Sequence, residues 1–433
     1  MSSYKTILII PNHAQPFDLK MVDGFSQAIQ RIGINAIPLS EPVDDHLLNT
    51  LVRETNASVV LRINRPPPDI TERANKFRHF SWIQDNTPDF DWCFDRLHED
   101  DLVFTIGTRK ALGVPVPDKY YGGVLTTYID PTDFSQFEDP LSEDLDLNLV
   151  GYIPAYHCGR FIGGLNEAPS TVRVGEFNFK QWKDAFRNLV CWENQEDPLF
   201  TYQMKEQVQL ESLFEKYSIE ELFACYLYEP LTGILSCRET LQSLKSFYQE
   251  LGLTCSTKRA GYLINEMPRF LDRYALASRT AKLNINMKFY GTNWNGFAEF
   301  ADFAESPVTL EKANEIFARS RVTLQNNTHG IGIHYRTLSA MASGGLILTH
   351  GSPHDRCDGG MKHEFEDGMH YIEFNRDSYE DVLSDWLNRG ADREKIKKEA
   401  RRYVIEKFSW DKGAQKFLAM ADLNPREIKY VYG

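Results

Sequence analysis

The sequence predicts an α/β protein of two domains, each built on a parallel sheet flanked by helices. Short apolar runs such as Thr6–Ile10 alternate with amphipathic stretches of helical periodicity, which is the pattern of doubly wound parallel sheets. The chain has 433 residues, too many for one hydrophobic core and a good fit to two domains of ordinary size.

The first domain follows from an unbroken alternation of strands and helices. After Thr6–Ile10 the pattern predicts strands at Asn35–Leu39, Ser58–Ile63, His79–Ile83 and Leu102–Ile106, with helices near Phe17–Ile32, His46–Arg53 and Asp69–Phe77. No GxGxxG motif follows the first strand, which argues against an ordinary dinucleotide-binding enzyme. Gly122–Phe137 reads as the exit from this domain, and the acidic stretch Glu138–Asp146 as a hinge.

The second domain opens with the apolar run Leu147–Ile153, and its next clear strand, Asn286–Tyr290, comes far later. A structureless loop of that length is improbable in a compact domain. We therefore expect a helix-rich insertion at about 155–265, for substrate recognition or oligomerisation. Helical periodicity supports it at Gln203–Tyr217, Ile219–Tyr228, Arg238–Glu250 and Ala260–Ala277, the last interrupted by Pro268.

The stretch Arg321–His350 is the central unit of this domain. Its pattern predicts, in order, a short strand around Val322 and Leu324, a polar glycine loop at Asn326–Gly332, a helix at Ile333–Ser343, a stop at Gly344 and Gly345, and a strand at Leu346–Leu348. Such a loop and helix N-terminus present backbone N–H groups above the end of a sheet. Phosphate is the natural ligand of that arrangement.

Polar residues follow two strands of the first domain, at the end of the sheet where ligands collect. Asp85 is the second residue after the strand His79–Ile83, and it is our first choice for a functional carboxylate. His13 lies at the equivalent end of the first strand. The alternatives are structural: Asp85 could turn the chain ahead of Pro88, and a lone loop histidine is more often solvated.

Composition excludes several classes of protein. The net charge of −13 makes non-specific nucleic-acid binding improbable, and no apolar run approaches the roughly 20 residues that span a membrane. The N-terminus MSSYKTILII lacks the features of a signal peptide. Seven scattered cysteines without a CxxC motif suit a reducing cytoplasm, where we expect the protein.

One polar loop contains several side chains that bind metals in other proteins. They are His350, His354, Asp355, Cys357 and His363. Their spacing matches no zinc signature, and a polar loop over a ligand site explains them as well. We therefore expect no metal ion.

The run HYRTLSAMASGGLILTH resembles the corresponding segment of group 1 glycosyltransferases, especially the spore-maturation-type branch. Arg336, Ala340, Ala342 and Gly344 match the family pattern, whereas the family Glu is Ser339 here. Three further segments resemble the same family: TTYIDPTDF before the linker, YGTNW after the strand Asn286–Tyr290, and FSWDKGAQKFLAM near the C-terminus.

The resemblance implies the GT-B fold, in which two Rossmann-like domains face each other across a cleft. It divides the chain into an acceptor-side domain (1–143), a donor-side domain with the insertion (144–410) and a C-terminal helix that crosses back (411–433). The implied activity is transfer of a sugar from a nucleotide-diphosphate sugar to an unidentified acceptor, without a cofactor or metal.

The residues expected to act fall into two groups. Asp85, His13 and Arg336 are the catalytic candidates. The donor-binding candidates are Gly332, Ile333, His334, Arg336, Thr337, Ser339, Asn326, Asn327, Gly291 and Arg160, the last of which is as readily a surface residue. Backbone N–H groups and a fixed guanidinium would stabilise the charge of a departing diphosphate.

Two other function classes remain open. A sugar-nucleotide epimerase can share the two-domain architecture, because a fold does not choose its chemistry. A non-catalytic nucleotide-sugar-binding or scaffold protein is favoured by Ser339 in place of the family Glu and by the large insertion, whose aromatic residues could meet a second subunit.

Overall fold

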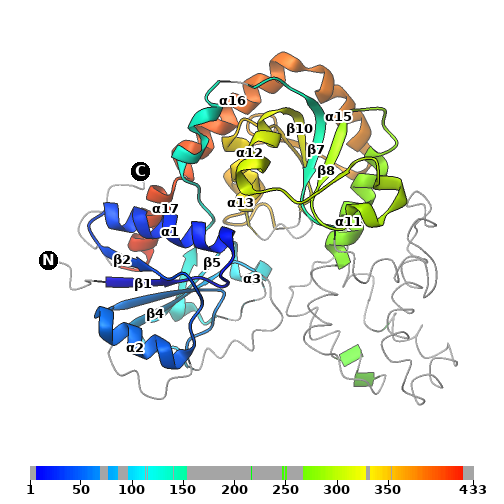
Figure 1. The fold of residues 1–433 in the computed structure, drawn as a ribbon. Coiled ribbons are helices and arrows are strands. Elements are labelled where there is room, and N and C mark those ends of the chain that lie inside the picture. The colour runs from blue at the N-terminus through cyan, green and yellow to red at the C-terminus, as the bar shows by residue number, and fades with distance from the viewer. Residues whose placement is uncertain are drawn as a thin grey trace.

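A computed structural model describes residues 6–68, 77–85, 96–112, 114, 116–139, 141–153, 267–327, 332–352 and 354–422, with 216, 246, 247, 249 and 250 as isolated positions. These residues form two α/β domains, each with a six-stranded sheet (Figure 1). The predicted insertion and Arg160 lie outside the described residues. No helix of the described part is long and apolar enough to cross a membrane.

The first sheet has the order β2-β1-β3-β4-β5-β6, and all its neighbouring strands run parallel. Its strands are β1 (Thr6–Ile10), β2 (Asn35–Pro38), β3 (Val59–Ile63), β4 (Arg78–Ile83), β5 (Leu102–Thr105) and β6 (Tyr121–Val124). The helices are α1 (Pro16–Arg31), α2 (Asp45–Thr55) and the short α3 (Arg109–Leu112). Strands β1 and β3 are buried along their whole length, as their apolar runs predicted.

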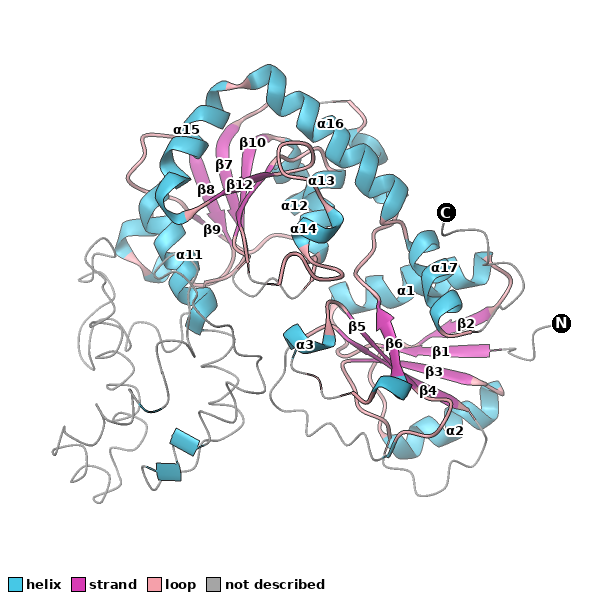
Figure 2. Cartoon of the chain, turned by 180° about the vertical axis from the view of Figure 1, so that it is seen from behind, coloured by secondary structure: helices cyan, strands magenta, loops and turns pink. Residues whose placement is uncertain are grey.

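The second sheet has the order β12-β11-β10-β7-β8-β9 and is also parallel throughout. Its strands are β7 (Leu145–Val150), β8 (Met287–Tyr290), β9 (Ala304–Glu305), β10 (Ser320–Gln325), β11 (Ile347–His350) and β12 (Ile372–Phe374). The helices are α11 (Met267–Thr280), α12 (Leu310–Ala318), α13 (Tyr335–Ala342), α14 (Met361–Glu364), α15 (Tyr379–Asn388) and α16 (Gly390–Lys407). Helices cover both sheets, which confirms the predicted α/β class (Figure 2).

The last helix, α17 (Trp410–Met420), packs on α1 of the first domain, and Figure 1 shows the two side by side. The ring of Phe25 on α1 lies 5.8 Å from that of Trp410 and 5.3 Å from that of Phe417. Gly24 makes this approach possible, because a Cβ atom there would lie 2.6 Å from the Trp410 indole nitrogen. The chain therefore ends its described part against the domain in which it began.

Local details differ from the sequence prediction in several places. The strand predicted at Leu147–Ile153 ends at Val150, because Gly151 takes a positive φ and turns the chain. The helix predicted at Ala260–Ala277 is described from Met267 onward as α11 and extends to Thr280, while residues 260–266 lie outside the described part. The pattern also missed the short strands β9 and β12 and several 3₁₀ turns, at Asp118–Tyr120, Pro131–Phe137, Trp294–Gly296, Ala298–Phe300 and Arg376–Ser378.

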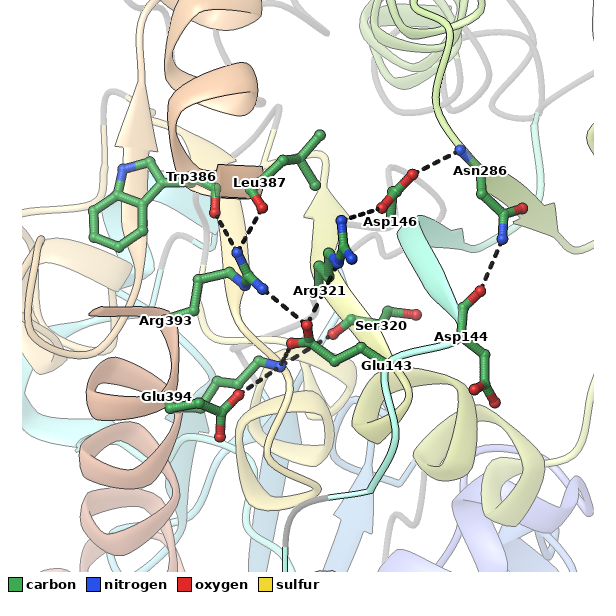
Figure 3. Close-up of polar contacts among 11 residues, drawn as sticks. Glu143, Asp144, Asp146, Asn286, Ser320, Arg321, Trp386, Leu387, Arg393 and Glu394 are labelled. Atoms are coloured by element: carbon green, nitrogen blue, oxygen red, sulfur yellow. Dashed lines mark hydrogen bonds and ion pairs between the residues drawn. The ribbon is translucent and has the colours of Figure 1, made fainter. Parts of the chain in front are cut away.

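Glu143, at the entry to the second domain, accepts hydrogen bonds from two buried cations of α16 (Figure 3). Its carboxylate lies 2.8 Å from Arg393 Nη2 and 2.6 Å from Lys397 Nζ, and both cationic residues are only 5% exposed. Arg393 also donates to the carbonyls of Trp386 and Leu387. Burial alone would raise the pKa of Glu143, but the bonds from Lys397 and Arg393 outweigh it and hold that pKa below its usual value.

Replacing Glu143 should destabilise the fold. Glu143→Gln leaves Arg393 and Lys397 charged in buried positions, which costs about 3 kcal/mol for a fully buried pair and about 2 kcal/mol here, because Glu143 is partly exposed. Scanning calorimetry at neutral pH should show a lower melting temperature. The lowered pKa makes this stabilisation present at neutral pH and lost on acidification, so wild type and variant should converge once Glu143 is protonated.

The matched control is Glu394→Gln, since Glu394 also pairs with Lys397, at 3.4 Å, but its side chain is 47% exposed. That change should cost less than about 0.5 kcal/mol. Equal losses in the two variants would contradict the assignment of Glu143 as the essential partner.

Candidate functional site

Asp85 follows β4 and is held by a residue that the sequence analysis missed. Asn64, directly after β3, is buried and takes a left-handed backbone with φ +49°. Its amide nitrogen donates to the Asp85 carboxylate at 2.7 Å, and its amide oxygen accepts from the backbone N–H groups of Gln84, at 2.6 Å, and Asp85, at 3.2 Å. The Asp85 carboxyl group is therefore fixed at the carboxyl end of the first sheet.

The charges around Asp85 come from both domains. Asp85 reaches solvent, yet protein crowds its carboxyl group, and this desolvation raises its pKa against the opposing effects of Asn64, Arg269 and His13. Arg269 belongs to α11 of the second domain, so the two domains meet electrostatically here. The backbone N–H of His13 donates to Asp18 at 2.9 Å, which brings a second carboxylate close to Asp85.

Two arginines of α11 surround the end of the central strand β7. Arg269 donates to the Tyr152 hydroxyl at 2.7 Å, and Arg273 donates to the Tyr152 carbonyl. Both guanidinium groups also lie over the Tyr152 ring, at 6.0 Å and 5.0 Å from its centre. They are four residues apart on one helix, so they share one face of it.

Arg336 adds a third cation at the same place. It lies in the first turn of α13, and a Cβ atom on Gly151 would come within 2.8 Å of its Nη1 atom. Arg336 reaches solvent, yet neighbouring protein desolvates its guanidinium group and so lowers its pKa. The charge of Arg269 lowers that pKa further. Within the described part of the chain, Arg336 has no hydrogen-bond or ion-pair partner. We call Arg269, Arg273 and Arg336 the arginine cluster.

The loop before α13 touches the first domain. Gly332 has φ +142°, and a Cβ atom there would lie 3.0 Å from the Ile106 carbonyl oxygen. The Thr127 hydroxyl donates to the Ile333 carbonyl at 2.9 Å, and the rings of Phe17 and Tyr335 pack edge to face at 5.1 Å. Gly332 and Ile333 therefore join the two domains in addition to any contact with a ligand.

The ends of β10 and β11 are joined by a buried polar cluster. The Asn327 backbone donates to His350 Nε2 at 3.1 Å, so the proton of this imidazole is on Nδ1, 3.0 Å from the Gly351 carbonyl. Burial lowers the pKa of His350, in keeping with a neutral ring. The Asn327 side chain and the Ser352 backbone donate to the Asp355 carboxylate, whose pKa burial raises to about 6.

Three predicted donor-binding residues make contacts within the second domain. Ser339 is 3% exposed and donates to Asn314 of α12, so this side chain packs inside the domain. Thr337 is buried and accepts from Gln325. Gly291 packs directly against the backbone of Gly151, since a Cβ atom at position 291 would be 2.4 Å from the Gly151 carbonyl oxygen. Each of these three residues makes structural contacts inside the second domain, and its role in donor binding stays a prediction.

The other predicted residues stay near the strand ends. His334 is the exposed N-cap of α13, and the Asn326 amide lies 3.3 Å from His350 Nε2. The metal-ligand types around His350 do not gather into a site: among the described residues, no group of three or more His, Cys, Asp or Glu side chains could hold a metal ion.

A family model described as "Glycosyl transferase-like" matches residues 269–419. The matched residues, about a third of the chain, are therefore similar to glycosyltransferases. The match contains all three residues of the arginine cluster, including the two that the sequence analysis missed. No curated protein matches the chain.

Solved glycosyltransferase structures share the overall fold. The glycosyltransferase AviGT4, involved in avilamycin A biosynthesis, is 11% identical with a TM-score of 0.50, and the match covers 97% of each chain. A glycosyltransferase from Rickettsia africae ESF-5 is 9% identical with a TM-score of 0.47, covering 97% of this chain and 98% of that one. Anabaena HepE, solved with UDP-glucose, is 9% identical with a TM-score of 0.44, covering 96% and 99%. The match to AviGT4, together with the two parallel six-stranded sheets, confirms the predicted GT-B arrangement of two Rossmann-like domains.

The buried carboxyl group of Asp355 predicts a pH-dependent stability. Its raised pKa means that the folded protein holds this proton more tightly than the unfolded chain does, so the stabilisation is full below the unfolded pKa and is lost as pH rises through about 6. The side chain introduced by Asp355→Asn is neutral at every pH. The free energy of unfolding of this variant, relative to that of the wild type, should therefore rise between pH 4 and pH 7 by at most about 3 kcal/mol, and its relative melting temperature should rise with it. An Asp377→Asn control at an exposed site should show no such trend. A difference independent of pH for Asp355→Asn would refute the assignment.

Proposed function

We propose that this protein transfers a sugar from a nucleotide-diphosphate sugar to an acceptor. The observation that carries the proposal is the arginine cluster: three guanidinium groups meet at Gly151 and Tyr152, and Arg336 has no partner among the described residues. Like charges held together are stabilised when an anion binds among them. A diphosphate carries this negative charge, and the spacing of its oxygen atoms matches the paired N–H donors of a guanidinium group.

The same groups serve the chemistry of transfer. When the bond between the sugar and the diphosphate breaks, negative charge develops on the leaving phosphate oxygen. Arg336 and the backbone N–H groups of the first turn of α13 would stabilise that charge in place, which supports transfer without a metal ion.

Asp85 is the proposed partner of the acceptor hydroxyl. Its raised pKa suits a group that takes up a proton during the reaction, and Asn64 fixes its orientation. The charge of Arg269 acts on both Asp85 and Arg336, which supports a common site for the acceptor-side carboxylate and the donor-side cation. His13 lies near the same carboxylate and is the proposed second acceptor-side group.

Finer assignments extend this proposal. The Arg336–Gly344 pattern supports the spore-maturation-type branch, and the scattered cysteines support a cytoplasmic location. The predicted insertion at about 155–265 is the proposed site of acceptor recognition or self-association. No nucleic-acid partner is proposed, given the net charge of −13.

Arg336 variants test the donor site directly. Arg336→Ala loses the charge and the fork, whereas Arg336→Lys keeps the charge; each lost charged contact costs about 1.5–3 kcal/mol, or roughly 10- to 100-fold in affinity. Calorimetric titration with UDP, ADP and GDP should therefore show strongly weakened binding of the preferred nucleotide in Ala and a smaller loss in Lys. The melting temperature of the ligand-free protein should change little, because Arg336 has no partner in the described structure.

The matched control is Arg389→Ala, a surface arginine paired with Asp385 on α15, which should bind nucleotide normally. The donor-site role of Arg336 fails if Arg336→Ala melts much earlier yet binds every nucleotide as wild type does. That result would make Arg336 a structural residue.

Asp85→Asn tests the acceptor side. With the nucleotide sugar that raises the melting temperature most in a thermal-shift screen, transfer should fall by roughly 10²- to 10⁴-fold while donor affinity stays within about twofold.

Asn64→Gly keeps the left-handed backbone but removes the hydrogen bond that lowers the pKa of Asp85, so the rising limb of the pH–rate profile should move to higher pH. Exposed Asp100→Asn is the control. Full transfer activity in Asp85→Asn would exclude this carboxylate from the reaction.

A further inference from the structure

Tyr152 lies between the two helices that carry the arginine cluster. It is the second residue after β7, and it accepts hydrogen bonds from Arg269 and Arg273 of α11. Arg336 of α13 lies against Gly151, the residue before it, and Tyr152 also acts electrostatically on Arg336. One tyrosine therefore adjoins all three cations of the cluster.

The hydroxyl and the main-chain carbonyl of Tyr152 hold different arginines. Arg269, which is only partly buried, donates to the hydroxyl at 2.7 Å, whereas Arg273, which is 7% exposed, donates to the carbonyl. Both guanidinium groups lie over the ring. Replacing the tyrosine by phenylalanine would keep the ring and the carbonyl, so it would remove one interaction, the hydrogen bond to Arg269.

The main chain on both sides of Tyr152 is fixed by buried hydrogen bonds. The indole N–H of Trp294, which is fully buried, donates to the Gly151 carbonyl at 2.7 Å. The side-chain amide of Asn293 donates to the Ile153 carbonyl at 3.0 Å. These bonds give the YGTNW segment a structural role, and they hold the Tyr152 hydroxyl at one place before any ligand arrives.

Arg269 also faces the first domain, through its charge on Asp85. The groups that act on this carboxylate come from several elements: His13 follows β1, Asn64 follows β3, and Asp18 belongs to α1. Among these groups Arg269 alone comes from the second domain. Its charge stabilises the ionised form of Asp85, so the place where Arg269 is held matters on both sides of the proposed site.

We propose that Tyr152 is a positioning residue, whose hydroxyl holds the Arg269 guanidinium where it serves both the donor diphosphate and Asp85. A guanidinium has five N–H donors, so the bond to the hydroxyl does not exhaust it. An arginine that is already oriented loses less conformational entropy when an anion binds. The hold on Arg269 needs no ligand, whereas its service to a diphosphate rests on the proposed function.

The first test is a double-mutant cycle on nucleotide affinity, measured by calorimetric titration with the best-bound of UDP, ADP and GDP. Tyr152→Phe should weaken binding about three- to tenfold, and Arg269→Ala about tenfold or more. In the Arg269→Ala background, Tyr152→Phe should cost less than about twofold, because the hydroxyl no longer has this arginine to hold.

The matched control is Tyr121→Phe. Tyr121 also has a guanidinium over its ring, that of Arg109 at 4.9 Å, and its hydroxyl also has a partner, Thr105 at 3.1 Å. It lies at the amino end of β6, at the opposite edge of the first sheet from Asp85. Tyr121→Phe should therefore bind nucleotide as the wild type does.

The second test needs no nucleotide. Carboxyl ¹³C NMR follows the titration of Asp85, whose signal is identified by its absence in Asp85→Asn. Because the charge of Arg269 lowers the pKa of Asp85, the titration midpoint should move to higher pH in Tyr152→Phe and further in Arg269→Ala. A tyrosine that only stabilised the fold would leave this midpoint where it is.

Two results would overturn the proposal. One is an equal loss of affinity from Tyr152→Phe with and without Arg269, which would mean that the hydroxyl contacts the nucleotide itself. The other is an unchanged Asp85 midpoint in Tyr152→Phe while Arg269→Ala shifts it. If the wild-type chain binds none of the nucleotides, the proposed transfer function fails together with the diphosphate role of Arg269, but a shifted midpoint in Tyr152→Phe would still support the hold on Arg269.

Discussion

The carboxylate of Glu143 is the contact on which the arrangement of the second domain depends. It lies where the chain enters this domain, and its partners Arg393 and Lys397 lie on α16, the helix through which the chain leaves it. Lys397 also donates to the Ser320 carbonyl, at the start of β10. Two cations that are 95% shielded from water need a carboxylate to pack against the sheet. Glu143 therefore holds the entry and exit of the domain at one place.

Backbone hydrogen bonds hold the segment between α16 and α17 where the chain returns to the first domain. The Ile129 N–H donates to the Phe408 carbonyl at 2.8 Å, and the Trp410 N–H donates to the Ile129 carbonyl at 2.9 Å. Arg401 donates both to the Phe134 carbonyl, in the exit from the first domain, and to the Ala342 carbonyl, at the C-terminal end of α13. The helix that carries Arg336 is therefore anchored at its far end to the segment joining the domains, while its first turn packs on α1.

Hydrophobic periodicity, together with the rule that ligands bind at the carboxyl ends of parallel strands, predicted most of the fold and only part of the site. They located the strands before Asp85 and the glycine-stopped helix of Arg336, because these signals are local in the sequence. They missed Arg269 and Arg273, which lie far from β7 in the sequence and reach its end only through tertiary packing. The orientation of Ser339 was also beyond a motif match, since a helix has two faces and this hydroxyl is turned toward Asn314.

Charge matching separates two parts of the second domain. At the end of β7 the protein collects guanidinium groups, and at Arg336 it leaves one without a partner in the described structure, so the local field favours an anion there although the net charge of the chain is −13. On α16, by contrast, Arg393 and Lys397 share the carboxylate of Glu143, and Arg402 lies 2.5 Å from Glu399. These cations are neutralised within the protein, whereas the charge of Arg336 stays available at the strand ends, where a diphosphate would meet it.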